Sequence, residues 1–134
     1  MKRYFTMIEM VVVVLLIALL SAIAMPMYFS YLKDARVTAA QTQIEMLEQA
    51  VLDYSMRMGS IPAQEGGLEL LVTNPSNDKR WRPFLKGGVV PLDPWGNKYI
   101  YQILPDGEFE LISYGEDGKV GGEGYAADIT NRKK

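Results

Sequence analysis

The chain carries very few residues that could do covalent or acid–base chemistry. Its 134 residues include no cysteine and no histidine, which excludes thiol nucleophiles, disulfides, Cys/His zinc sites and imidazole catalysis. Chemistry would have to come from carboxylates, and these lie on one face of a predicted helix or in one glycine-rich loop, residues 113–131. Neither place offers a convincing pair of acids for general acid–base work. The sequence therefore argues against an enzyme.

The charge pattern argues against a nucleic-acid-binding protein. The formal net charge is −2, and lysine and arginine are scattered except in the C-terminal tail, Arg132, Lys133 and Lys134. Nucleic-acid binding normally needs basic residues gathered on one surface. Three basic residues at a chain end are more typical of a solvated terminus, which is how we interpret this tail.

Glu9 is an acid at the mouth of a long apolar segment. The run from Met10 to Phe29 is almost entirely apolar, and at about 1.5 Å per residue a helix of this length crosses a bilayer core of about 30 Å. A charge in mid-membrane costs roughly 2.5 to 3.5 kcal/mol on insertion scales. Glu9 is therefore either solvated at the headgroup level or matched by a partner of opposite charge.

The flanks of this segment predict how it lies in a membrane. Lys2 and Arg3 precede it without a comparable basic cluster close behind it, which favours a cytoplasmic N-terminus and an exported remainder. The alternative is a cleaved secretory signal peptide, because Ala22-Ile23-Ala24 offers a small-x-small cleavage pattern. Glu9 speaks against that alternative, since a signal peptide has no use for an acid there.

The chain from about Phe5 to Met58 is predicted to form one long helix, closed by Gly59. Pro26 is predicted to kink or locally open it. Beyond Pro26, apolar residues recur at steps of three and four, which places them on one helix face. That face carries Val37, Ala40, Ile44, Leu47, Val51, Tyr54 and Met58, and the opposite face carries Asp34, Glu45 and Asp53.

This apolar stripe has two interpretations. A homodimeric coiled coil is one, but the repeat lasts only about three heptads and includes a small alanine. Packing against a compact C-terminal region is favoured. That region, residues 59–134, is predicted to hold a short helix and a small antiparallel sheet. The predicted elements are a helix at 67–72, strands at 98–104 and 109–114, and a hairpin turn at 105–108.

The N-terminal motif Phe5-Thr6-Met7-Ile8-Glu9, followed by the apolar run and Pro26, resembles the class III signal of type IV pilins and pseudopilins. The resemblance implies that a prepilin peptidase cuts between Tyr4 and Phe5 and methylates the new amine of Phe5. It also implies that Glu9 pairs with the N-terminus of a neighbouring subunit during assembly, with Pro26 at a position that the family shares. Tyr4 departs from the pattern, because the family cuts after glycine.

Two further segments resemble the major pseudopilin of type II secretion systems, the general secretion pathway protein G family. They are Gly66-Gly67-Leu68-Glu69-Leu70-Leu71 and the stretch 91–99, which contains Asp93-Pro94-Trp95-Gly96. The resemblance covers nearly the whole chain and is weakest over residues 74–86. Without it, the Asp-Pro-Trp-Gly stretch would read as an ordinary turn with a packed tryptophan.

The resemblance to this family implies an α+β, pilin-like fold in a single-pass protein of the bacterial inner membrane. We expect a leader at 1–4, a transmembrane helix half at 5–29, an amphipathic half at 30–58 and a periplasmic globular region at 59–134. The implied function is that of a structural subunit of the pseudopilus, which pushes folded proteins through the outer membrane. Implied partners are further copies in a helical filament, other pseudopilins, an inner-membrane assembly platform, the prepilin peptidase and membrane lipid.

The segment from Ser113 to Asn131 resembles the calcium loop of major pseudopilins. Calcium takes six to eight oxygen ligands from carboxylates and carbonyls. The resemblance implies side-chain ligands from Asp117 and Asp128 and backbone carbonyls from Tyr114 and Lys119.

This calcium loop departs from the family at one ligand. The family has a third carboxylate just ahead of Asp128, where this chain has Ala126 and Ala127, and Glu123 is the candidate to replace it. The alternative is a solvated glycine-rich loop that the same acids close by hydrogen bonds.

Two other functions stay open at this point. One is a type IV pilin or minor pilin-like subunit of a surface fibre, which shares the N-terminal signal. The absence of a cysteine pair, the short length and the Asp-Pro-Trp-Gly stretch argue against it. The other is an exported binding module anchored by an uncleaved signal, which Tyr4 keeps open.

Overall fold

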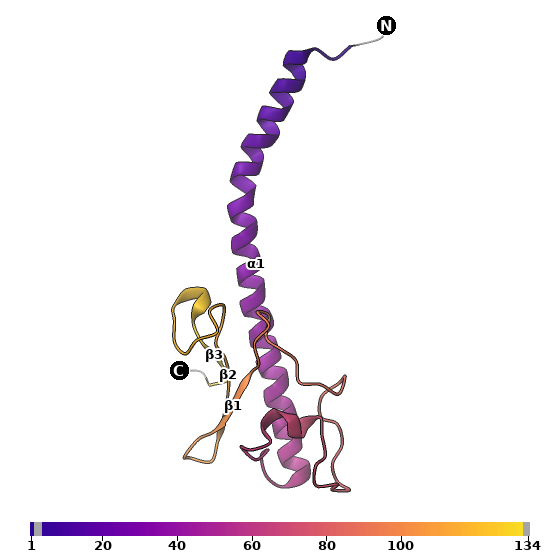
Figure 1. The fold of residues 1–134 in the computed structure, drawn as a ribbon, viewed down its shortest axis with the longest axis vertical. Coiled ribbons are helices and arrows are strands. Elements are labelled where there is room, and N and C mark those ends of the chain that lie inside the picture. Colours follow the sequence, from indigo (N-terminus) through magenta and orange to yellow (C-terminus); the bar gives the residue numbers. More distant parts are fainter. Residues whose placement is uncertain (2–3, 133–134) are drawn as a thin grey trace. The chain divides into compact units, whose positions relative to one another are not determined.

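The computed structural model describes residue 1 and residues 4–132, and its path is drawn in Figure 1. The elements run in the order α1 Met7–Met58, η1 Gly67–Leu71, β1 Ile100–Ile103, β2 Phe109–Ser113, η2 Gly124–Ala126 and β3 Ile129–Thr130. The chain divides into two compact units, residues 1–35 and 36–134. Lys2, Arg3, Lys133 and Lys134 lie outside the described residues, so the topology and tail predictions that rest on them stay predictions.

Helix α1 begins two residues later than predicted because Thr6 caps it. The Thr6 hydroxyl oxygen accepts a hydrogen bond of 3.3 Å from the Glu9 N–H, and the Thr-x-x-Glu spacing is that of a capping box. The backbone stays helical through Pro26, so the helix is not broken there. At the other end Gly59 has a φ of 89° and donates its N–H to the Ser55 carbonyl at 2.8 Å. Gly59 closes the helix as predicted.

The predicted apolar stripe of α1 forms one wall of the core. Five of its seven residues are buried and the outer two, Val37 and Met58, are partly buried. The buried five are Ala40, Ile44, Leu47, Val51 and Tyr54. The other wall comes from the chain's own C-terminal region, with Leu68, Leu71, Leu85, Tyr99, Tyr101 and Leu111. The stripe therefore packs within the subunit, as favoured over a coiled coil.

The sheet has three antiparallel strands in the order β1-β2-β3. The predicted hairpin is confirmed, with Ile100 opposite Ile112 and Ile103 opposite Phe109. Its turn is closed by the Gly107 N–H on the Leu104 carbonyl at 2.9 Å, and Gly107 has the positive φ that this turn requires. The predicted helix at 67–72 is the 3-10 helix η1, whereas β3 and η2 were not predicted.

A side chain covers the outer edge of β1. Gln64 donates its Nε2–H to the Tyr101 carbonyl at 2.9 Å and accepts the Ile103 N–H at 2.7 Å. One amide group thus makes the two bonds that a neighbouring strand would make. Two backbone groups of this edge are thus satisfied within the subunit, which leaves less of a template for strand addition by another chain.

Leu47→Ala should destabilise the fold by about 2 to 5 kcal/mol, because Leu47 is fully buried between α1 and the sheet and its truncation leaves a cavity. The measurement is urea unfolding of the full chain in detergent, followed by circular dichroism. Leu52→Ala is the matched control on the same helix, since Leu52 is 42% exposed. Equal losses for the two variants would contradict the assignment of the core face.

The free energy of unfolding should fall as the pH rises from about 10 to 12. Burial, helped by nearby Tyr54, raises the pKa of Tyr101 from 10.0 to about 12, and its hydroxyl donates to the Pro62 carbonyl at 2.8 Å. Folded Tyr101 therefore keeps its proton where the unfolded chain loses it. Tyr101→Phe should make the decline shallower in pH-dependent urea unfolding, and an unchanged decline would show that Tyr101 does not cause it.

Candidate functional site

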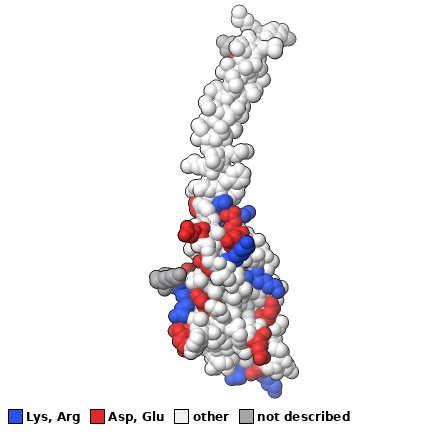
Figure 2. Space-filling model, turned by 60° about the vertical axis from the view of Figure 1, so that its left-hand side comes forward, with Lys and Arg blue, Asp and Glu red and all other residues white. Residues whose placement is uncertain are grey.

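The apolar segment of α1 is exposed along its whole length. Its most apolar 18-residue window has a mean hydropathy of 2.8 and none of that window is buried, and α1 is the one described helix long and apolar enough to cross a membrane. Figure 2 shows this segment as an almost uncharged surface, with charges of both signs intermixed on the face of residues 36–134 in view. So large an apolar surface is not stable in water and needs lipid or other chains.

The predicted processing and assembly residues lie at the start of this segment. Tyr4 and Phe5 precede the helix and are 84% and 74% exposed. Glu9 lies exposed in the first turn of α1, where the helix dipole favours a negative charge. Pro26 lies inside the helix, well away from Glu9 in sequence.

The glycine-rich loop joins β2 to β3, and its two arms approach closely. Gly122 has a φ of 99°, and a Cβ added there would clash with the Ala126 carbonyl oxygen. A Cβ on Gly115, whose φ is 64°, would lie 2.9 Å from the Ala127 carbonyl oxygen. Only glycine fits such positions, because they combine a left-handed backbone with no room for a side chain. The glycines thus allow a tight fold of the loop.

The loop's own hydrogen bonds hold this fold. The Gly121 N–H donates to Asp128 Oδ2 at 2.8 Å, and the Lys119 N–H donates to Asp117 Oδ1 at 3.0 Å. The Glu116 N–H bridges the arms to the Tyr125 carbonyl at 3.2 Å. Asp128 therefore ties its arm to Gly121 by a hydrogen bond, whereas the bond of Asp117 is local to the first arm.

One atom of the loop is left without a partner. Asp128 Oδ1 is buried and has no hydrogen-bond partner among the described residues. An unpaired buried carboxylate oxygen is costly, so native proteins normally match it with a donor or a cation. Asp128 Oδ1 is therefore the atom of this loop that best fits a calcium ion.

The remaining predicted ligands are less well placed to act together. Within residues 4–132 no three histidine, cysteine, aspartate or glutamate side chains gather in a way that could hold a metal. Asp117 and Glu123 are exposed, and Asp117 already accepts the Lys119 N–H. A calcium ion here would depend largely on backbone carbonyls, for which Tyr114 and Lys119 remain the predicted donors. The ligand set stays a prediction.

Asp93 has a structural role that its sequence context did not predict. The Asp-Pro-Trp-Gly stretch was interpreted as a turn with a packed tryptophan, yet Trp95 is only partly buried while Asp93 is 4% exposed. Asp93 Oδ1 accepts the N–H groups of Trp95 at 3.1 Å and Asn97 at 2.8 Å, and Oδ2 accepts the Ser113 hydroxyl at 2.8 Å. An aspartate followed by proline and glycine predicts a turn of this kind. The sequence around Asp93 does not reveal its hydrogen bond to Ser113, which lies twenty residues further along the chain.

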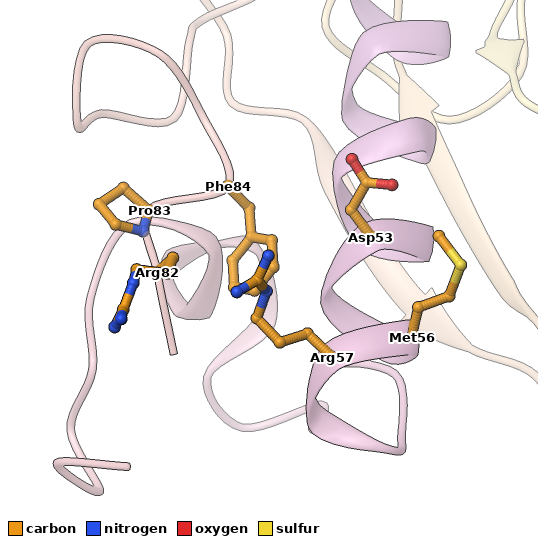
Figure 3. Close-up of a pocket in the computed structure, with 6 residues that line it drawn as sticks. All are labelled: Asp53, Met56, Arg57, Arg82, Pro83 and Phe84. Atoms are coloured by element: carbon orange, nitrogen blue, oxygen red, sulfur yellow. The ribbon is translucent and has the colours of Figure 1, made fainter. Parts of the chain in front are cut away.

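A separate groove of about 580 Å³ lies beside the C-terminal end of α1, and Figure 3 shows its lining. Arg57 reaches from α1 toward Phe84, and Asp53 lies one turn earlier on the helix (Figure 3). Arg82 donates to the Trp81 carbonyl at 3.0 Å. The lining has one carboxylate, so it cannot supply the acid pair that carboxylate catalysis requires. It includes none of the predicted site residues.

Comparison with known proteins identifies relatives over most of the chain. Residues 27–132 match the family described as type II secretion system (T2SS), protein G. The type II secretion system core protein G of Pseudomonas aeruginosa is 38% identical over 132 residues, which cover 95% of this chain and 92% of the relative. That of Vibrio cholerae is 37% identical over 131 residues, covering 95% and 89%.

A solved structure has the same fold. The crystal structure of the major pseudopilin from the type 2 secretion system of enterohaemorrhagic Escherichia coli aligns with a TM-score of 0.61. The alignment covers 77% of this chain and 91% of that chain at 24% identity. The expected α+β architecture, a long N-terminal helix on a small antiparallel sheet, is thereby confirmed.

Gly122→Ala should destabilise the loop by about 1 to 3 kcal/mol more than Gly121→Ala. Both glycines have a φ near 90° or above, but only a Cβ on Gly122 would meet another atom within 4 Å. Both variants carry the same backbone strain, so the difference between their free energies of unfolding reports the cost of the close contact alone. Urea unfolding of the full chain in detergent gives both values, and equal losses would contradict the close approach of Gly122 to Ala126.

Proposed function

This chain belongs to the type II secretion system protein G family, and on that premise we propose that it is a structural subunit of the pseudopilus. The observation that carries the proposal is the family match over residues 27–132, joined to an exposed apolar helix segment that one subunit alone leaves uncovered. The match favours this function over a type IV pilin of a surface fibre and over an anchored binding module. Copies of the chain assemble into a helical filament that pushes folded proteins through the outer membrane.

The apolar segment anchors the subunit before assembly. It crosses the inner membrane once, with the N-terminus in the cytoplasm and residues 36–134 in the periplasm. Its length and hydropathy support this placement. In the filament the same surface would be covered by the apolar segments of neighbouring copies, because close helix packing can replace lipid contacts.

Glu9 sets the register of assembly. The prepilin peptidase cuts between Tyr4 and Phe5, which creates a methylated amine at Phe5. This amine pairs with Glu9 of a neighbouring copy. A carboxylate in apolar surroundings becomes tolerable when an opposite charge arrives, so only correctly docked subunits satisfy both groups. The exposure of Tyr4, Phe5 and Glu9 in the single subunit supports the proposal.

The chain acts as a component and not as an enzyme. Work on the filament comes from partners, namely the inner-membrane assembly platform and a cytoplasmic ATPase, and other pseudopilins join the same filament. In support, the chain has neither cysteine nor histidine, and the groove of Figure 3 has a single acid. The subunit contributes shape, apolar surface and charge.

We also propose that the loop between β2 and β3 binds calcium. Asp128 would hold the ion through its unpartnered Oδ1, with Asp117, the carbonyls of Tyr114 and Lys119, and Glu123 as further donors. When bound, the ion would stabilise the folded state, since a ligand that binds only the folded chain adds its binding energy to stability. Asp128 itself also orders the loop through the Gly121 N–H.

Glu9→Ala should reduce filament assembly to background while membrane insertion stays intact, because the variant removes the charge partner and leaves the apolar segment unchanged. The measurement is electron microscopy of sheared filaments together with membrane fractionation. Glu45→Ala is the control, since Glu45 is an exposed acid farther along α1. A normal filament yield for Glu9→Ala would exclude the pairing mechanism.

Calcium should raise the Tm of the full chain in detergent by several degrees, because each kcal/mol of binding energy shifts Tm by about 4 to 8 °C in a domain of this size. Asp128→Asn should abolish the shift, whereas Asp106→Asn, in the exposed hairpin turn, should keep it. The Tm is followed by circular dichroism with calcium and with chelator. Identical melts of the unmodified chain in both would rule out the calcium site.

A further inference from the structure

The turn formed by residues 93–97 is hydrogen-bonded to the start of the glycine-rich loop through Asp93 and lies beside its first arm at Asn97. Resting on the calcium site proposed above, we propose that this turn is the platform that holds residues 114–119 in shape for the ion. Asp93 would be a positioning residue, which acts on the loop through Ser113 and does not touch the ion. The Asp-Pro-Trp-Gly stretch would then serve the loop, twenty residues further along the chain.

The first contact is a chain of hydrogen bonds that starts at Asp93. The Ser113 hydroxyl donates to Asp93 Oδ2 at 2.8 Å, and the same hydroxyl oxygen accepts the Gly115 N–H at 3.3 Å. Ser113 is fully buried and Asp93 is 4% exposed. The bond to Asp93 fixes where the hydroxyl hydrogen points, so the oxygen's lone pairs are free to face Gly115. Asp93 thereby orients the hydroxyl of Ser113 toward the N–H of Gly115, at the start of the loop.

Gly115 lies against the return arm of the loop, so its position affects that arm as well. The carbonyl oxygens of Ala127 and Tyr125 lie 2.9 Å and 3.1 Å from the position of a Cβ on Gly115. Directly after Gly115, the Glu116 N–H donates to the Tyr125 carbonyl at 3.2 Å. Because the arms touch here, the position of Gly115 controls how they meet. The return arm then leads to Asp128, whose unpartnered oxygen is the proposed ligand.

The side chain of Asn97 lies beside the same arm, at Gly118. Its amide nitrogen lies 3.4 Å, and its amide oxygen 3.6 Å, from the position of a Cβ on Gly118. Gly118 has a φ of 64° and lies between the predicted donors Asp117 and Lys119. The turn is therefore hydrogen-bonded to the first arm near Gly115 and lies beside it at Gly118, where an added side chain would meet Asn97.

The platform is held together by backbone hydrogen bonds of its own. Asp93 and Asn97 pair through the Asp93 N–H and the Asn97 carbonyl at 2.8 Å, and the Gly96 N–H donates to the Asp93 carbonyl at 2.9 Å. Leu92 and Lys98 form a bridge at its base. Next to it Tyr99 is buried in the core and donates its hydroxyl to Gln43 of α1. The chain is thus bonded to the helix two residues after the turn ends.

A buried carboxylate with three bonds is a costly way to make a simple turn, because desolvating a charge is unfavourable unless every bond is made. Two of the bonds, to Trp95 and Asn97, would suffice for the turn. The third reaches Ser113 and has no use in the turn itself. Its use is to preorganise the loop, since a site that is ordered before binding loses less entropy when the ion arrives.

The test is amide hydrogen exchange of the full chain in detergent without calcium, read by mass spectrometry. Ser113→Ala and Asp93→Asn should speed exchange of peptides covering 114–121 about tenfold, the effect of losing one hydrogen bond to a charged group. Peptides covering the core residues of α1 should change much less. Ser55→Ala and Asp106→Asn are the controls, because each removes a hydrogen-bonding group of the same type outside the loop.

A double variant tests whether Asp93 acts on the loop through Ser113 or by destabilising the whole fold. If Asp93 acts through Ser113, Asp93→Asn should add little to loop exchange in a Ser113→Ala background. Unchanged loop exchange in a folded Ser113→Ala chain would overturn the proposal. So would equal acceleration throughout the chain, and if Asp93→Asn does not fold, Ser113→Ala alone decides.

A calcium titration of the same proteins distinguishes the two proposals. If the unmodified chain binds calcium, both variants should weaken the affinity about tenfold by calorimetry, and unchanged affinity would overturn the positioning role. If the unmodified chain binds no calcium, the calcium site fails, and faster loop exchange in the variants would still support the platform.

Discussion

The fold of residues 36–134 depends on one packing contact, the apolar stripe of α1 against the C-terminal region. The sheet has three strands, the longest of five residues, and a sheet this small is not stable without a partner that covers its apolar face. Leu47, Val51 and Leu111 have no exposed surface because helix and sheet bury one another. The turns and loops of this region are attached to core residues such as Tyr99, Tyr101 and Leu111, so they depend on the same packing contact.

The N-terminal part of the same helix has a different surface from the part that packs on the core. There the side chains are apolar on every face and none is buried within the subunit, so this segment is shaped for surroundings that the subunit does not supply. A helix that is apolar all round suits lipid or other helices, whereas a striped helix suits one packed face. One element therefore anchors the subunit, covers its core and offers a surface to its neighbours.

Most of the fold could be predicted because it rests on long or repeated patterns. The spacing from Val37 to Met58 predicted the buried face of α1, and Pro105 with Gly107 predicted the hairpin turn. Thr6 shifted the start of α1 because a capping bond outweighed the apolar pattern. Strand β3 has two residues, too few for an alternating pattern, and it exists because β2 offers an edge.

The site was less predictable than the fold. The acids of the loop could be named from their sequence, but which carboxylate oxygen would be buried, as Asp128 Oδ1 is, depends on how the two arms meet. The burial of Asp93 depends on a contact with Ser113 across the fold, and neither residue carries a local sign of it. Apolar patterns therefore predict elements, while hydrogen bonds between distant segments decide the geometry of the site.

The central claim is that α1 is retained as the anchor and assembly surface of a filament subunit. Intact mass and N-terminal peptide mapping of the protein from its native membrane test it most directly. The predicted result is a chain that begins with methylated Phe5 and keeps the whole apolar segment. A chain that begins near Met25 would have lost Glu9 and the anchor, and would contradict the account.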